Sequence, residues 1–434
     1  MFTSAGDPAV EATISKQMEV VVSESTKVYG SDCTVILSGG FGRGEGSVRW
    51  GENGYPLPIH DFDLYLVTDR KVDPAIHASL EARIMAKLRE TTGGSLSADD
   101  FVLGLQVIPL RSLNRLPPDI SNYELKAAST VIYGSDVRPL IPGTSKDVAL
   151  ASGAITLFHR TTALLKNVEP GYLESEHYPP AKQFECVYEC CKIYTEICTA
   201  LSLLGGFYEP SYRLRALALE TNYQRFPALQ KELPDLASRV KAHTEMKLQS
   251  DFSPIISDPA GSWLEARREL DICLRFFLSK FLSMGFYPSW SALHPEAEKR
   301  LKRLFFYDYL SFYLNSLGIR GTQYVYAANI LFQAYDSYSF RTKTRKFGKF
   351  SPGGLSLTSP ILNIYLSSAL VLFSLRDNGS IDNGLLRLGR NHLRKVLSLS
   401  ETSGSDKQLW VQARDACVDG QRVYFGIKQR KMVL

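Results

Sequence analysis

Apolar and polar positions alternate between two periods over the first 145 residues of the chain. Stretches with an apolar residue every three to four positions predict helices, and short continuous apolar runs predict buried strands. In chain order the pattern predicts a helix over 9–28, strands over 33–37 and 61–67, a helix over 74–92, a strand over 101–110 and a helix over 122–131. This mixture is typical of an α+β fold in which helices cover a mixed sheet.

The pattern changes after residues 133–153, a stretch rich in glycine, proline and serine. Beyond it, apolar residues recur with a period near 3.6 and prolines separate the segments, so we expect an all-helical C-terminal region. A weaker break lies near 289–295. We therefore expect three parts: an α+β domain over 1–145, a helical domain over 150–290 and a second helical region over 295–434.

Hydropathy and cysteine usage predict a cytoplasmic protein without a membrane span. The most apolar segment, Ile361–Leu375, is shorter than the roughly 18 residues that indicate a span, so it is predicted to be a buried helix. The N-terminus has no apolar run behind a basic start, so no signal peptide is predicted. Seven cysteines, an odd number, indicate reduced thiols, and those between 186 and 198 are expected to be buried in a helix rather than to bind zinc.

Composition excludes a disordered or collagen-like chain. The 434 residues are 44% hydrophobic and 22% charged, and this length predicts about two to three domains. The net charge of +5 is too small to indicate a nucleic-acid binder by itself. Residues 339–349 are expected to form a basic loop that carries Arg341, Lys343, Arg345, Lys346 and Lys349. This loop is either a solvated surface loop or a contact for a phosphate-rich acceptor such as RNA.

Candidate chemistry is concentrated in one segment, where the glycine-rich sequence Ser38–Ser47 follows the first predicted strand. Glycines lack side chains, so their backbone N–H groups can approach a polyphosphate closely. Arg43, in the same turn, adds a guanidinium group that can bind phosphate oxygens through two hydrogen bonds. This turn is therefore a predicted phosphate-binding site.

Two aspartates open the next predicted strand. Asp61 and Asp63 are two positions apart, so the alternation of side chains along a strand puts both carboxylates on one face and Phe62, Leu64 and Leu66 on the other. Mg²⁺ prefers one or two carboxylates together with substrate phosphates. The aspartates therefore predict a Mg²⁺ site, with Mn²⁺ as the alternative ion, beside the phosphate-binding turn, as phosphoryl transfer requires.

Other phosphate-binding and metal-binding motifs do not fit this segment. No lysine follows the glycines, which excludes a GxxxxGK[ST] P-loop, and Glu45 stands where a GxGxxG dinucleotide motif needs its third glycine. A calcium loop requires an oxygen ligand where Tyr65 stands. The remaining alternative is a tight turn whose aspartates only face solvent, but two exposed like charges beside a glycine turn have no packing reason to be there.

The sequence SGGFGRGEGS followed by HDFDLYLV resembles the nucleotidyltransferase superfamily typified by DNA polymerase beta, especially its small bacterial and archaeal members and the kanamycin-type enzymes. The resemblance covers about the first 145 residues and implies a nucleotidyltransferase-type mixed sheet with flanking helices. It also implies Mg²⁺-dependent transfer of a nucleoside monophosphate from an NTP, expected to be ATP, to an acceptor that is RNA, protein or a small molecule. On this resemblance Asp61 and Asp63 are catalytic and hold the metal. The implied nucleotide-binding residues are Ser38, Gly39, Gly40, Gly42 and Arg43.

The sequence departs from the family pattern in two places. Residues 50–58 lengthen the spacer before Asp61, as an inserted turn, and Gln106 stands where relatives usually carry a third carboxylate on the next strand. A glutamine oxygen can bind a metal or water but cannot accept a proton as a general base. Auxiliary candidates are therefore Glu45, His60 and Gln106. The alternative function is a degenerate nucleotide-binding protein that retains the NTP site, or an RNA-interacting module.

Overall fold

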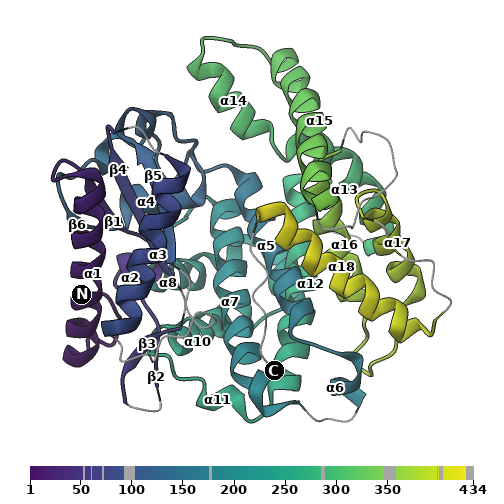
Figure 1. Cartoon of the computed structure of the whole chain (residues 1–434). Helices are drawn as coiled ribbons and strands as arrows, with labels where there is room; N and C mark the ends of the chain where they lie inside the picture. The colour runs from purple at the N-terminus through teal and green to yellow at the C-terminus, as the bar shows by residue number, and fades with distance from the viewer. Residues whose placement is uncertain are drawn as a thin grey trace.

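The computed structural model has a sheet-containing part next to a larger helical part (Figure 1). It describes residues 1–51, 54–59, 61–70, 73–91, 103–174, 178–284, 289–346, 358–397, 399 and 404–426. The elements of the first part, which we call the sheet domain, are α1 (Pro8–Tyr29), β1 (Thr34–Leu37), α2 (Gly39–Gly42), β2 (Val48–Trp50), β3 (Pro56–Pro58), β4 (Phe62–Thr68), α3 (Pro74–Thr91), β5 (Leu103–Pro109), α4 (Ile120–Ala127) and β6 (Thr130–Tyr133).

The second part, which we call the helical part, begins at Leu150. Its elements are α5 (Leu150–Lys166), α6 (Pro170–Glu174), α7 (Pro180–Gly205), α8 (Tyr212–Asn222), α9 (Pro227–Glu232), α10 (Leu236–Gln249), α11 (Ser253–Ile256), α12 (Pro259–Phe281), α13 (Trp290–Leu304), α14 (Tyr307–Ser316), α15 (Thr322–Lys346), α16 (Pro360–Ser374), α17 (Asn383–Arg394) and α18 (Asp406–Phe425). A mixed sheet followed by helices confirms the predicted α+β class.

Within the described residues, four strands form one mixed sheet in the order β5–β4–β1–β6. Strand β1 is antiparallel to β4 and β6, whereas β4 and β5 are parallel and α3 forms the crossover between them. Because side chains alternate along a strand, Leu37 and Leu64 pack on the face covered by α1 and α3. Ile36 and Tyr65 pack on the opposite face, with Leu125 of α4.

Two parts of the sheet domain differ from the sequence-based prediction. The helix predicted over 122–131 ends at Ala127, and residues 130–133 instead form the edge strand β6 beside β1. A short apolar run at a helix end fits both structures locally, and only pairing with β1 selects the strand. The insertion at 50–58, predicted as a turn, contributes to the β2–β3 hairpin.

One hydrophobic cluster runs through the helical part, from Ala154 to Cys417. Its centre is α16, in which every residue is buried, so the buried helix predicted at 361–375 is confirmed. The cluster includes residues on both sides of 290. The helices expected to form two regions therefore share one core.

The predicted basic loop at 339–349 is wrong over its described residues. Residues 339–346 belong to the C-terminal end of α15, and residues 347–349 lie outside the described residues. Phe340 and Thr344 are buried and four positions apart, so packing of this helix face holds the stretch in a helix. Figure 1 shows α14 and α15 projecting apart from the sheet.

Two further predictions concern the cysteines and membrane-spanning helices. All seven cysteines are free and buried, as expected. Among the described helices, none combines the length and apolar character needed to cross a membrane.

Candidate functional site

The glycine turn meets the aspartate strand where Gly39 contacts Asp63. The Ser38 N–H donates a 2.7 Å hydrogen bond to the Asp63 carbonyl oxygen, because β1 and β4 pair through Leu37 and Leu64. Gly39 has a φ of +63°, and a Cβ atom at this position would lie 2.1 Å from Oδ2 of Asp63. Only glycine lets the turn and the carboxylate come this close.

Asp61 and Asp63 lie together above Gly104, the residue of β5 that pairs with Asp63. A Cβ atom at Gly104 would lie 3.4 Å from Oδ1 of Asp63 and 3.8 Å from Oδ2 of Asp61. Both aspartate side chains are exposed to solvent. The structure thus brings the two predicted metal ligands together, and both next to the glycine turn.

The pKa of Asp63 is raised to about 7. Desolvation by the surrounding protein is the largest cause, although the side chain remains accessible, and the negative charge of Asp61 adds to it. The positive charge of Arg43 opposes the shift. A carboxylate pair whose charge is incompletely balanced by the protein is a typical environment for a bound cation.

Strand β5, described in full from Leu103 to Pro109, contributes no carboxylate to this face. Gln106 pairs with Tyr65, two pairs further along the strands than Gly104 and Asp63, and interacts with the Tyr65 hydroxyl. Its side chain is exposed. Gln106 therefore shares the face of the aspartates but lies beside Tyr65 rather than opposite Asp63.

Arg43 occupies a different environment from the one predicted. Its side chain is 3% exposed, with Nη1 2.5 Å from Glu124 Oε2 and Nε 3.3 Å from Glu45 Oε2. The Tyr212 ring covers the guanidinium group, with its centroid 4.4 Å from Cζ. The prediction that Arg43 binds the triphosphate directly does not fit this position, because protein groups already occupy the guanidinium.

Glu124 of α4 connects the sheet domain to the helical part. Besides Arg43, it binds Arg215, with a distance of 2.7 Å between Nη2 and Oε1, and it accepts a 2.7 Å hydrogen bond from the Tyr208 hydroxyl. Burial disfavours the charged form of Glu124, but the two guanidinium groups outweigh this effect and lower its pKa. This buried ion-pair network fixes α4 and α2 against α8.

Glu45 makes a second connection to α8. Its carboxylate accepts hydrogen bonds from the Ser211 hydroxyl at 2.6 Å and from the backbone N–H groups of Tyr212 at 2.9 Å and Arg213 at 3.2 Å. A carboxylate at a helix N-terminus satisfies otherwise unpaired N–H groups and interacts favourably with the helix dipole. These contacts assign Glu45 a structural position rather than the auxiliary catalytic one considered from the sequence.

The remaining glycines of the turn differ in what they can offer a ligand. The Gly42 N–H donates to the Ser38 carbonyl oxygen at 3.0 Å, and a Cβ atom at Gly42 would lie 2.1 Å from the carbonyl oxygen of Leu37. Gly42 is therefore required by backbone packing, and its N–H is not free for phosphate as predicted. No side chain caps the start of α2, so the N–H groups of Gly39 and Gly40 can face a ligand.

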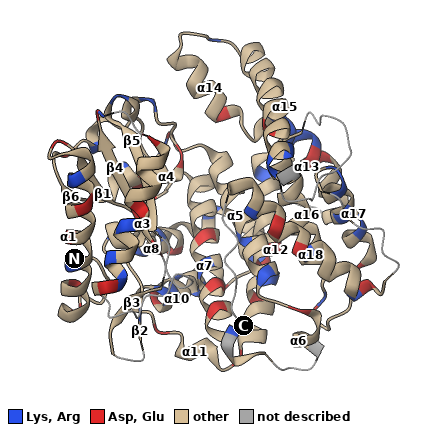
Figure 2. Cartoon of the chain, viewed as in Figure 1, with Lys and Arg blue, Asp and Glu red and all other residues tan. Residues whose placement is uncertain are grey.

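Two lysines of the helical part lie near the site, and the charge of one of them, Lys192, acts on the carboxylate pair. Lys192 of α7 lies close enough to Asp61 and Asp63 for its charge to influence them, and it forms a 3.7 Å ion pair with Glu189. Burial lowers the pKa of Lys192, and it lowers that of the buried Lys247 of α10 to about 8. Figure 2 shows acidic and basic residues gathered around α7, α8 and α10 beside the sheet domain.

A polar pocket of about 380 Å³ adjoins this network. Its lining includes Asp119, Glu124, Ser152, Glu196, Arg215 and Tyr309. The walls come from α4 of the sheet domain and from α5, α7, α8 and α14 of the helical part. A molecule bound in this pocket would touch both parts of the chain.

Sequence reasoning did not identify Glu124, Lys192 or Lys247. Each lies on a separate helix with no local motif, and only the packing of the two parts brings them to the site. His60, considered as an auxiliary residue, lies outside the described residues. Comparisons of the chain with protein-family models, curated proteins and solved structures find no match.

Proposed function

We propose that this protein is a Mg²⁺-dependent nucleotidyltransferase that transfers a nucleoside monophosphate from an NTP, with ATP as the expected donor. The single observation that carries the proposal is the contact between Gly39 and the Asp63 carboxylate, with Asp61 on the same face. This contact supports the proposal because it brings a carboxylate pair of the kind that binds Mg²⁺ next to a turn whose N–H groups can donate to phosphate. The resemblance of SGGFGRGEGS and HDFDLYLV to this superfamily supports the same function.

Each residue near this point has a role in the proposed reaction. Asp61 and Asp63 bind Mg²⁺, and the N–H groups of Gly39 and Gly40 donate to phosphate oxygens. Lys192 of α7, whose charge acts on Asp61 and Asp63, would add positive charge for the triphosphate. When bound, Mg²⁺ neutralises phosphate charge and aligns the reacting groups. An acceptor hydroxyl or amino group bonds to the α-phosphorus and gives up its proton to water, the bond from the α-phosphorus to the α,β-bridging oxygen breaks, and pyrophosphate leaves.

The pocket next to Glu124 is the proposed acceptor site. Its lining contains the carboxyl groups of Asp119 and Glu196, which would repel a polyanion, besides Glu124, whose charge Arg43 and Arg215 compensate. The same groups accept hydrogen bonds from hydroxyl and amino groups. The pocket therefore favours a small polar acceptor over RNA, and the position of α15 apart from the sheet agrees with this preference.

The test is pyrophosphate release from labelled NTPs with Mg²⁺ and a panel of acceptors that includes polyols, amines, RNA and the protein itself. Asp61→Ala and Asp63→Ala should each reduce turnover on the order of a hundredfold or more, because a metal clamp contributes several kcal/mol. Asp69→Ala is the matched control, since Asp69 is an exposed aspartate just beyond the same strand. Failure to bind any NTP, or turnover in both site variants equal to that of the wild type, would reject the proposal.

A second candidate function is nucleotide binding without catalysis. The observation that favours it is the composition of β5, where Gly104 lies opposite Asp63, Gln106 lies opposite Tyr65 and no acid is present along the strand. Calorimetry with Mg²⁺ and a non-hydrolysable NTP, combined with the pyrophosphate assay, separates the two candidates. Tight binding without pyrophosphate release for any acceptor supports the binding protein, whereas turnover eliminates it.

A further inference from the structure

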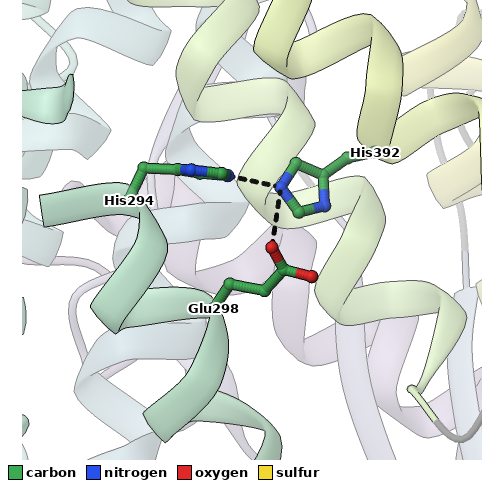
Figure 3. Close-up of side chains that lie close together, drawn as sticks. All are labelled: His294, Glu298 and His392. Carbon is green, nitrogen blue, oxygen red and sulfur yellow. Dashed lines mark hydrogen bonds and ion pairs between the residues drawn. The ribbon is translucent and has the colours of Figure 1, made fainter.

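Two histidines and a glutamate converge in the helical part (Figure 3). His294 and Glu298 are four positions apart on α13 and therefore share one helix face, and His392 reaches them from α17. The two histidines are 98 positions apart in the chain, so only tertiary packing makes them neighbours.

The donor atoms of this trio point at one another. The Nε2 atoms of His294 and His392 are 2.6 Å apart, and Nε2 of His392 is 3.9 Å from Oε2 of Glu298. All three donor atoms lie within 4.8 Å of one another. Ligand atoms at about 2.0–2.2 Å from a tetrahedral zinc ion are roughly 3.2–3.6 Å apart. The distance between the two Nε2 atoms, 2.6 Å, is shorter than this range, and the distance from Nε2 of His392 to Oε2 of Glu298, 3.9 Å, is longer. Side-chain shifts of less than about 1 Å would complete the geometry.

Neighbouring residues orient two of these ligands. The Nδ1 of His392 lies 2.9 Å from Oδ1 of Asn363, an acceptor, so Nδ1 carries the proton and the lone pair of Nε2 faces the centre of the trio. Oε1 of Glu298 accepts from Lys302 and from Lys395, each at 2.9 Å, which leaves Oε2 directed at the imidazoles. An oriented histidine with a partner on its second nitrogen is typical of metal ligands.

Burial also favours a metal ligand set. His294 is 8% exposed and His392 is 1% exposed. Without a metal, Nε2 of His294 donates its proton to Nε2 of His392, so the trio holds two neutral imidazoles beside the Glu298 carboxylate. A bound cation would accept the lone pairs of both rings and the charge of Glu298 together.

We propose that His294, Glu298 and His392 bind a first-row transition metal ion, Zn²⁺ in particular, as a centre that joins α13 to α17. Two nitrogens and one carboxylate suit Zn²⁺, whereas Mg²⁺ prefers oxygen ligands only. Three protein ligands leave a fourth position for water. This centre is separate from the aspartate pair and does not depend on the proposed nucleotidyl transfer.

The test is metal binding by the full chain after treatment with a chelator and its removal. We expect one Zn²⁺ per chain by calorimetry, no competition from Mg²⁺, and a melting temperature several degrees higher with Zn²⁺. Co²⁺ in its place should give visible absorption bands without a thiolate charge-transfer band. A thiolate band, or no Zn²⁺ binding at tens of micromolar, would overturn the proposal.

Variants locate the ion. His294→Gln and Glu298→Gln should each weaken Zn²⁺ binding at least about tenfold and reduce the thermal shift, since each replaces an imidazole or a carboxylate with a neutral amide, a weaker ligand, at little change in volume. His243→Gln is the matched control, because His243 is a buried helical histidine outside the trio, stacked on Tyr194. His392→Gln is informative if circular dichroism shows that it folds, and otherwise the two α13 variants decide. Unchanged binding in both α13 variants would show that the ion binds elsewhere.

Discussion

The carboxylate of Asp63 fills the space that a side chain at Gly39 would need, with 2.1 Å between Oδ2 and a Cβ atom built on that glycine. Gly39 belongs to the turn after β1, and Asp63 belongs to β4, so the contact couples two elements of the site. The hydrogen bond from Ser38 to the Asp63 backbone holds the same two elements together. Any change that moves the turn therefore moves the proposed metal ligand, Asp63, with it.

Gly39→Ala should disrupt both the fold and the site. Alanine at a φ of +63° costs about 1–2 kcal/mol, and the clash with Asp63 adds to this cost. We expect a free energy of unfolding at least about 2 kcal/mol lower than that of the wild type, together with loss of Mg²⁺–NTP binding. Denaturant unfolding and calorimetry measure the two effects.

Gly206→Ala is the control for backbone strain alone. Gly206 has a φ of +70°, and a Cβ atom there meets nothing within 4 Å. This variant should lose stability by about 1 kcal/mol and retain ligand binding. Equal effects of the two substitutions on Mg²⁺–NTP binding would contradict the role of the Gly39–Asp63 contact.

Mg²⁺ binding should depend on pH with a transition near 7. Because the pKa of Asp63 is raised to about 7, protons compete with the ion below that pH, and affinity should rise by up to about tenfold per pH unit until it levels off. In Asp61→Asn the neighbouring charge is absent, so the pKa of Asp63 falls and the plateau begins at a lower pH. Asp69→Asn should keep the wild-type profile. A flat wild-type profile between about pH 5 and 8 would contradict this expectation.

Glu124→Gln should destabilise the junction of the two parts by about 3–5 kcal/mol, because Arg43 and Arg215 then lose the charge that compensates them in the interior. Glu220→Gln is the control, since Glu220 forms an exposed ion pair with Lys241, and it should cost less than about 1 kcal/mol. Urea unfolding gives both values. Similar losses in the two variants would argue against a stabilising network.

The same variant should change the dependence of stability on pH. Folding lowers the pKa of Glu124 from 4.5, so its charge contributes stability that is fully present above that pH and is lost as pH falls through the lower folded value. The stability difference between wild type and Glu124→Gln should therefore shrink in acid. A difference that is constant from neutral pH to strong acid would exclude this explanation.

Lys192→Met should change the affinities for the two ligands in opposite directions. Removing this positive charge should weaken binding of the NTP at least about tenfold, because the triphosphate loses a cation in a poorly solvated site. Binding of Mg²⁺ alone should instead tighten above pH 7, since repulsion from Lys192 disappears. Lys241→Met, at an exposed ion pair, should change neither affinity. A parallel loss of both affinities would indicate a structural effect.

Local sequence was sufficient for most of the sheet domain. The apolar pattern predicts both the strand β4 and the helix α3. The start of α3 also follows from its capping residue, Asp73, whose carboxylate accepts a 2.8 Å hydrogen bond from the Ala75 N–H. The position of Asp61 and Asp63 on the same face follows from the alternation of side chains along a strand. These features depend on residues a few positions apart, so their physical causes are contained in the sequence segment itself.

Only the tertiary structure decided which partners those residues meet. Arg43 looks like a phosphate ligand from its neighbours in the chain, but Glu124, 81 positions away, binds its guanidinium group. The edge strand β6 likewise depends on pairing with β1, and His294 meets His392 only through packing of α13 and α17. Charge compensation and burial act through space between segments that the chain separates, whereas hydrophobic period and capping act along it.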